Sequence, residues 1–194
     1  MCYVKSSRPD RMRINVLVSL EGCRFAAAYF ERGIFMDRQY TKIDIVRSIL
    51  DEELKKIEDE ELKRCAYVHL YGVGQAAAFL AMKRGFGREF AELAEIAGML
   101  HDYSKYVLND EAYHAEKSAK YARAILEKGK VFEVEDIKIV CDAIYNHSRK
   151  QEIGNAFCEV LKDADEMQHF FRNPTENYFF EKERIQKLMK ELGV

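Results

Sequence analysis

Apolar residues recur at intervals of three and four positions along the chain from about residue 41 onward. This spacing gathers them on one face of a helix, and the strict alternation that indicates strands does not occur there. The pattern predicts helices over seven ranges: 41–57, 60–84, 89–101, 114–128, 134–146, 156–171 and 175–192. The sequence therefore predicts an all-α fold, a bundle of about six to seven helices.

Several predicted helix ends carry residues that commonly cap helices. Thr41 or Asp44 is a candidate N-cap for the first helix, and Thr175 for the last, because their side-chain oxygens can accept a hydrogen bond from a free backbone N–H. Gly85 and Gly87 should end the second helix, since glycine is common just past a helix end.

Residues 1–35 show no comparable pattern, whereas regular helical spacing follows Met36. We therefore expect an N-terminal appendage over residues 1–35 and a compact domain over residues 36–194. The domain should end with the helix over 175–192.

Composition narrows the class of protein. The 31 basic and 33 acidic residues leave a net charge of −2 without a basic stripe, so we expect no binding to long nucleic acid. No run approaches the ~18 apolar residues that span a membrane. The five cysteines include no C-x-x-C pair, which is typical of free thiols in a reducing compartment. These features predict a cytoplasmic protein.

The first candidate for chemistry lies at the end of an apolar helical run, where His101 and Asp102 are followed by Lys105. His101 comes four residues after Ala97, so the helical period turns it toward the interior. A buried imidazole beside a buried carboxylate is costly unless a partner satisfies both, and a metal cation does so well.

The remaining candidates also fall on helix faces or helix ends. His69 lies on an apolar face, His114 begins a predicted helix, His147 ends another, and Asp165 lies within an apolar helical frame. Each alone has an ordinary explanation, such as a hydrogen-bonded core residue or a charge at a helix end. Together they form a mixed nitrogen and oxygen ligand set, which suits iron, manganese, zinc or nickel.

Two alternatives stay open near the last carboxylate. Asp163 and Glu166 compete with Asp165 as the acidic ligand. His169 lies one helical turn beyond Asp165. It could contact a metal-binding residue without binding the metal itself, or simply pack beside Phe170.

The order His69, His101-Asp102, His114, His147, Asp165 on successive helices resembles the HD-domain metal-dependent phosphohydrolase superfamily. The resemblance covers roughly residues 60–172, which would form the metal-binding core of an HD-domain helical bundle. The local sequence around the His-Asp pair, from Ala97 to Lys105, is similar to that of the branch that hydrolyses diadenosine tetraphosphate symmetrically.

The resemblance implies two divalent metal ions, commonly iron, with manganese, nickel, zinc or magnesium as alternatives. It implies that His69, His101, Asp102 and Asp165 hold one ion, and that His114 and His147 complete the second with Asp102 bridging. Two such ions share a hydroxide that attacks a phosphoryl group in line. Asp102 can bridge only if the helix ends there, because adjacent helical residues diverge by about 100°.

Three basic residues are candidates for contact with substrate phosphate. Lys105 would supply a fixed positive charge, and Arg149 and Lys150 directly follow His147. Each is also compatible with an ordinary solvated surface position.

The sequence therefore predicts a metal-dependent phosphohydrolase that cleaves a phosphate ester or anhydride of a nucleotide or another small phosphorylated metabolite. A di-iron oxygenase on the same scaffold and a non-catalytic sensor with structural metals are the alternatives. A homodimer is a further possibility, since the aromatic residues Tyr178, Phe179 and Phe180 could form either core or a subunit contact.

Overall fold

The structure is a computed structural model that describes residues 41–172 and 182–194. Its helices are α2 (Lys42–Lys55), α3 (Glu60–Lys83), α4 (Arg88–Leu100), α5 (Tyr103–Tyr106), α6 (His114–Gly129), α7 (Val134–Asn146), α8 (Ala156–Arg172) and α9 (Lys182–Leu192). No residue of these two ranges lies in a strand, so the prediction of an all-α bundle is confirmed.

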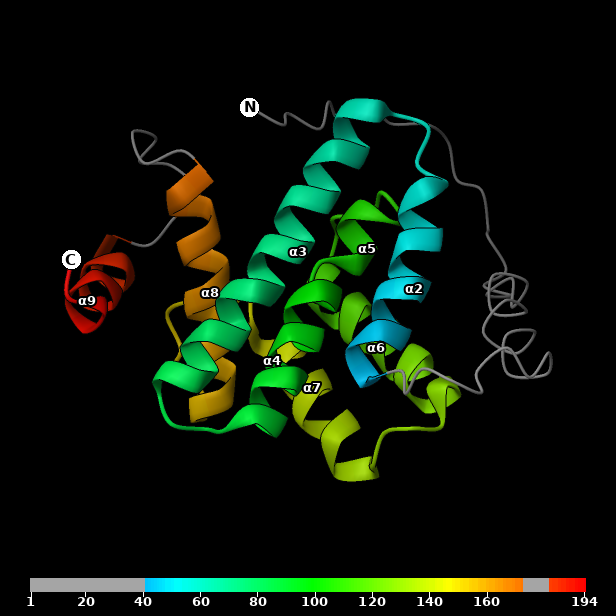
Figure 1. Ribbon diagram of the computed structural model, residues 1–194. Coiled ribbons are helices and arrows are strands. Elements are labelled where there is room, and N and C mark those ends of the chain that lie inside the picture. Colours follow the sequence, from blue (N-terminus) through cyan, green and yellow to red (C-terminus); the bar gives the residue numbers. More distant parts are fainter. Residues whose placement is uncertain (1–40, 173–181) are drawn as a thin grey trace.

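The long helix α3 packs along α4, which lies at the centre of the bundle, and along α8 (Figure 1). The α3 residues Leu70, Val73 and Leu80 are fully buried. Gly74 and Gly98 allow the backbones of α3 and α4 to touch, because a Cβ added at Gly98 would lie only 2.6 Å from the Cα of Gly74. This crossing fixes the two helices that carry the first two histidines.

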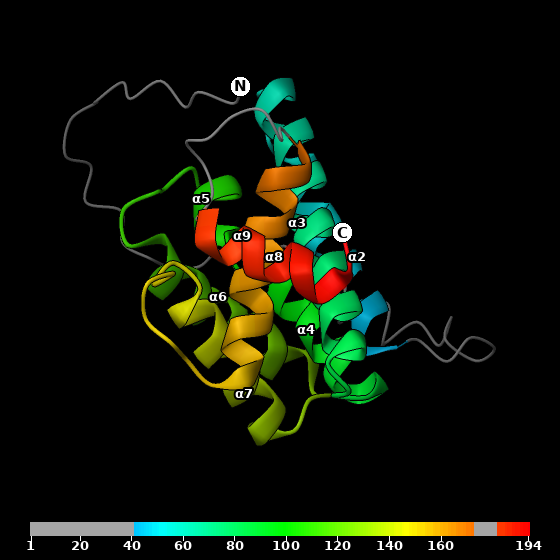
Figure 2. The ribbon, with the colours of Figure 1, turned by 90° about the vertical axis from the view of Figure 1, so that its left-hand side faces the viewer.

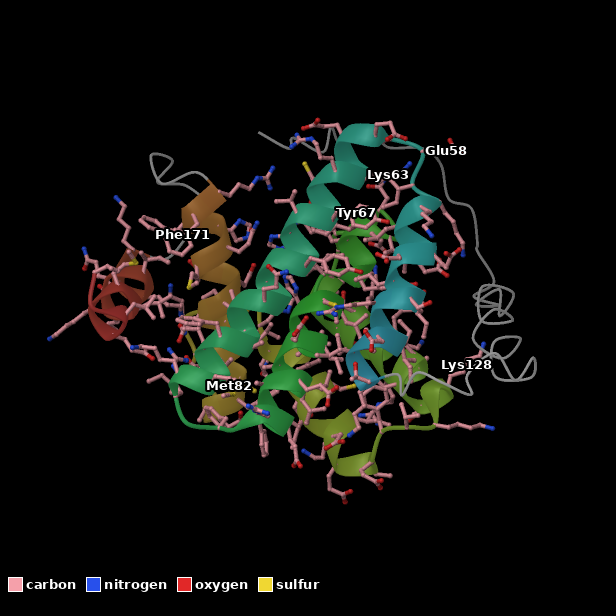
Figure 3. The ribbon with its side chains drawn as sticks, viewed as in Figure 1. Glu58, Lys63, Tyr67, Met82, Lys128 and Phe171 are labelled. Atoms are coloured by element: carbon pink, nitrogen blue, oxygen red, sulfur yellow. The ribbon has the colours of Figure 1, made fainter. Side chains whose placement is uncertain are left out.

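The outer helices cover this central layer. Tyr67 lies on α3 (Figure 3), and its hydroxyl reaches the backbone oxygen of Asp51 in α2 at 3.5 Å. Helix α9 crosses α8 (Figure 2) and buries Ile185 and Leu188. Arg184 of α9 also donates to Asp163 of α8 at 2.6 Å. Helices α6 and α7 pack on each other and complete the bundle.

The helix ends agree with the caps expected from sequence where the structure describes them. Thr41 caps α2 and forms a capping box with Asp44. Gly85, with φ of 79°, follows the end of α3. The short helix α5 was not predicted. The predicted appendage over 1–35 and the proposed cap Thr175 lie outside the described residues.

The cysteines among the described residues differ in their state. Cys141 and Cys158 are free thiols, as predicted. Cys65 takes part in a disulfide, so the prediction of free thiols is wrong for this residue.

Of the helices described, α3 alone is long and apolar enough to cross a membrane by length and composition, and half of the relevant window is buried inside the protein.

Candidate metal centre

All five histidines of the chain gather around two buried carboxylates, Asp102 and Asp165. Five different helices or helix ends supply them: α3 carries His69, the end of α4 carries His101, α6 begins with His114, α7 ends at His147, and α8 carries His169. The sequence-predicted ligands are thus brought together at one place in the bundle, and His169 joins them.

The end of α4 explains how two adjacent residues can face the same site. The helix ends at Leu100, and His101 still has helical backbone angles. Asp102 departs from them, with φ of −110° and ψ of 25°. The expected helix end at the His-Asp pair is therefore present, and both side chains are buried there.

Hydrogen bonds fix the orientation of four imidazole rings. The Nδ1 atoms of His101 and His147 each lie 2.7 Å from the carbonyl oxygen three residues earlier, an acceptor in the last turn of the helix. The Nδ1 of His114 lies 3.3 Å from the Glu111 carbonyl, and that of His69 lies 2.7 Å from Oε1 of Gln168. Because each oxygen can only accept, Nδ1 donates and the Nε2 lone pair faces the site.

The inward-facing atoms fit a cation. The Nε2 atoms of His69 and His101 lie 3.1 Å apart, so two lone pairs would face each other at contact distance. The Oδ1 atoms of Asp102 and Asp165 are buried without a hydrogen-bond partner. Such groups are costly inside a protein unless a positive charge lies between them. Ligand atoms about 2.1 Å from one ion lie roughly 3 Å apart at adjacent positions.

The two oxygens of Asp102 face two separate pairs of histidines. Its Oδ2 lies 3.5 Å from Nε2 of His69 and 3.6 Å from that of His101. Its Oδ1 lies 3.4 Å from Nε2 of His114 and 3.3 Å from that of His147. This arrangement lets one carboxylate contribute to two neighbouring ligand groups.

Asp165 presents one oxygen to the site and has the other one occupied. Its Oδ1 lies 3.5 Å from Nε2 of His69 and 3.6 Å from that of His101. Its Oδ2 accepts a hydrogen bond from the Lys150 ammonium at 2.5 Å. The competing acid Asp163 points elsewhere, to Arg84 and Arg184. The geometry therefore selects Asp165 over Asp163 as the carboxylate at the site.

The pKa values favour the protonation states that a cation binds. Burial lowers the pKa of His101 and of His114, which keeps both imidazoles neutral near pH 7. Burial alone would raise the pKa of Asp102, but the surrounding imidazoles bring it well below its usual range. Asp165 behaves in the same way, with the Lys150 ammonium as the largest lowering influence. Both carboxylates are thus anions near pH 7, which is the form that binds a cation.

The predicted basic residues take different places. The Lys105 Nζ lies 3.7 Å from Oδ2 of Asp102 at the edge of the site. Arg149 is more exposed and stacks over the Tyr145 ring at 4.9 Å. The ammonium of Lys150 is held by Asp165 and also lies 3.4 Å from Glu166, so it faces the carboxylates rather than solvent.

A pocket of about 320 Å³ opens beside His114, where α6 begins and α7 ends. Its walls include two aromatic rings, a hydroxyl and a guanidinium: Tyr113, Tyr145, Ser148 and Arg149. Tyr113 has a left-handed backbone conformation with φ of 54° and an exposed ring. The pocket shares His114 with the inner site, and the Glu116 side chain also lines it.

Sequence reasoning missed three contributors to this region. Gln168 has no signal beyond its place one turn from Asp165, and only the fold brings it to His69 across α3 and α8. Tyr113 and Tyr145 are ordinary tyrosines in the sequence, and the pocket they line depends on how α6 packs against α7.

A helical bundle with a centre of histidines and aspartates is typical of one class of metal-binding domain. Comparison with known families assigns the chain to such a class. The model of the HD domain matches residues 66–172, which is more than half of the chain. The chain therefore belongs to the HD-domain family. No curated protein and no solved structure matches it in the corresponding comparisons.

Proposed function

We propose that the protein is a metal-dependent phosphohydrolase that acts on a nucleotide or a similar small phosphorylated metabolite. The observation that carries the proposal is the pair of ligand groups that meet on Asp102, one on each carboxylate oxygen. Membership of the HD-domain family supports the same reading. The symmetrical diadenosine tetraphosphate hydrolases, to which the stretch from Ala97 to Lys105 is similar, suggest a dinucleoside polyphosphate as one substrate to test.

Two ions are proposed to occupy this centre. His69, His101, Asp102 and Asp165 would hold the first, and Asp102, His114 and His147 the second. When bound, the ions supply an activated water and neutralise charge on the phosphoryl oxygens. The family resemblance makes iron the first metal to test, and the mixed nitrogen and oxygen donor set leaves manganese, nickel, zinc or magnesium as alternatives.

The chain's own residues would bind and orient the substrate. Lys105, whose Nζ lies within 4.0 Å of both Asp102 and Glu111, would place a fixed positive charge beside the departing oxygen. Arg149 lies at the pocket next to His114, where its planar guanidinium suits a further phosphate group. The rings of Tyr113 and Tyr145 would hold a planar base by stacking.

Loss of Asp102 tests this proposal directly. D102A removes the one residue shared by both ligand groups, so phosphohydrolase activity should fall by about 1,000-fold or more. The anaerobically purified chain would be analysed for metal and screened against nucleoside phosphates, dinucleoside polyphosphates and cyclic dinucleotides. D142A, which removes an exposed aspartate that pairs with Lys138, is the control and should keep full activity.

Three outcomes would contradict the proposal. Full activity in D102A would exclude the shared carboxylate from the mechanism. Oxygen consumption coupled to an organic substrate, without phosphate release, would identify an oxygenase. Tight nucleotide binding without turnover in the metal-loaded protein would identify a sensor.

A further inference from the structure

The five imidazole rings form one continuous row through the centre. Ring centroids are separated by 4.9 Å between His169 and His69, 5.0 Å between His69 and His101, 4.8 Å between His101 and His147, and 5.2 Å between His147 and His114. The two ends of the row are His114 and His169. The family pattern assigns a ligand role to His114 and leaves His169 without one.

The two end histidines occupy equivalent positions relative to the carboxylates. The Nε2 of His114 lies 3.4 Å from Oδ1 of Asp102, and the Nε2 of His169 lies 3.3 Å from Oδ1 of Asp165. Their side chains are similarly accessible, with exposed fractions of 25% and 23%. The geometry that supports a ligand role for His114 therefore supports one for His169.

The helix itself brings His169 to this position. Asp165 and His169 are separated by four residues on α8, which places both side chains on the same face. His69 of α3 meets them there, so that ligand atoms of all three residues lie within 4.8 Å of one another. Simple packing beside Phe170 would not require the ring nitrogen to face an unpartnered carboxylate oxygen.

The carboxylates also indicate which ion His169 would join. Asp102 can serve two ions because its two oxygens face different histidine pairs. Asp165 cannot do the same, since Lys150 holds its Oδ2 and only Oδ1 faces the histidines. His169 approaches this same Oδ1 and must therefore share the ion that Oδ1 binds.

We propose that His169 is a fifth protein ligand of the first ion, beside His69, His101, Asp102 and Asp165. This inference rests on the metal centre of the proposed function. It makes the centre asymmetric, because the second ion keeps three protein ligands and borders the pocket at His114. An ion with few protein ligands retains open positions for water and substrate. The phosphoryl group should thus approach from the second ion.

Cobalt titration of the full chain tests the role of His169. The protein is stripped of metal with a chelator and titrated with Co²⁺, and equilibrium dialysis and visible absorption follow the tighter site. H169A should weaken that site about 10- to 100-fold and change its absorption, because one nitrogen ligand is lost. Millimolar imidazole should restore the absorption, since the position is partly open to solvent.

Two further variants make the result decisive. H169Q keeps a side chain of similar reach and should show the same loss of affinity even if H169A folds poorly. Phe171 lies on the same helix with an exposed ring (Figure 3), so F171A should leave the titration unchanged. Wild-type affinity and absorption in H169A or H169Q would overturn the proposal. Failure of the wild type to bind any Co²⁺ would instead overturn the metal centre itself.

Discussion

At the scale of single residues, His69 differs from the other buried histidines in what holds its ring. Backbone carbonyls accept the Nδ1–H of His101 and His147, so no substitution of an acceptor side chain can release those rings. For His69 the acceptor is the Gln168 side chain at 2.7 Å. Gln168 is therefore the one point at which a side chain among the described residues sets the tautomer of a fully buried histidine of the centre.

Replacing Gln168 tests this dependence. Q168L removes the acceptor while keeping a comparable volume, and should lower metal affinity about 10- to 100-fold. Q168E should retain most of the affinity, because a carboxylate also accepts from Nδ1–H. Equilibrium dialysis with Zn²⁺ or Fe²⁺ measures both variants. Equal affinities for Q168L and the wild type would show that the bond does not control the ring.

The neighbours Arg149 and Lys150 should separate into different roles. Lys150 is bound to Asp165, so K150M should weaken metal binding and lower kcat together. Arg149 lines the pocket and pairs with Glu152 rather than with Asp102 or Asp165, so R149M should raise KM about 10-fold with metal content unchanged. Metal analysis and steady-state kinetics on the same samples distinguish the two. A K150M protein with normal metal content and raised KM would favour the alternative expectation that Lys150 contacts substrate.

At the scale of helices, the periodic pattern was sufficient to predict most of the elements. The end of α4 at Leu100 and the start of α6 at His114 follow from the sequence because apolar spacing is a local property. The short helix α5 was missed, since Tyr103 to Tyr106 is too brief to show a period. The junction of α8 and α9, in which Arg184 meets Asp163, depends on long-range packing that no local pattern encodes.

The crossing of α3 and α4 should not tolerate a side chain at Gly98. G98A would place Cβ 2.6 Å from the Cα and N of Gly74, and neither backbone can move without displacing a helix. We expect a loss of about 3 kcal/mol in the free energy of unfolding. G129A is the matched control, because its Cβ would meet no atom closer than the Phe132 ring at 3.4 Å. Urea denaturation measures both, and similar stabilities would contradict the argument.

The contact between α8 and α9 should be sensitive to acid. Burial alone would raise the pKa of Glu159, but hydrogen bonds from the Gly154 N–H, Lys162 and Arg184 lower it to about 2. A lowered carboxyl pKa stabilises the fold above the ordinary value of 4.5, and this contribution disappears as pH falls from 4.5 toward 2. E159Q should therefore cost on the order of 2 kcal/mol at pH 7 and much less near pH 3.

Urea denaturation of the wild type and E159Q across this pH range measures the difference. E116Q, which lies on α6 away from this contact, is the control and should show little change at any pH. A difference between wild type and E159Q that stays constant from pH 7 to pH 3 would contradict the proposed linkage.

At the scale of the whole molecule, the residue types and their order allowed the inner site to be predicted, whereas its surroundings could not be. His69, His101, Asp102, His114, His147 and Asp165 are brought together from separate helices. Their types signal metal chemistry without any coordinates. Gln168 and the pocket tyrosines carry no comparable signal, because glutamine and tyrosine are common in ordinary packing. For His169 the sequence left both a supporting role and plain packing open.

The buried carboxylates link metal binding to the stability of the entire fold. Asp102 and Asp165 each keep an unpartnered oxygen inside the bundle, and the helices α3, α4, α7 and α8 converge on them. A cation that binds only the folded chain stabilises it by about 4 kcal/mol when its free concentration is 1,000 times its Kd. For a chain of this size the melting temperature should rise by roughly 10 °C. Differential scanning calorimetry of metal-free and metal-loaded protein measures the shift. D102A should lose it and D142A should keep it, and equal melting temperatures for the two wild-type forms would contradict this coupling.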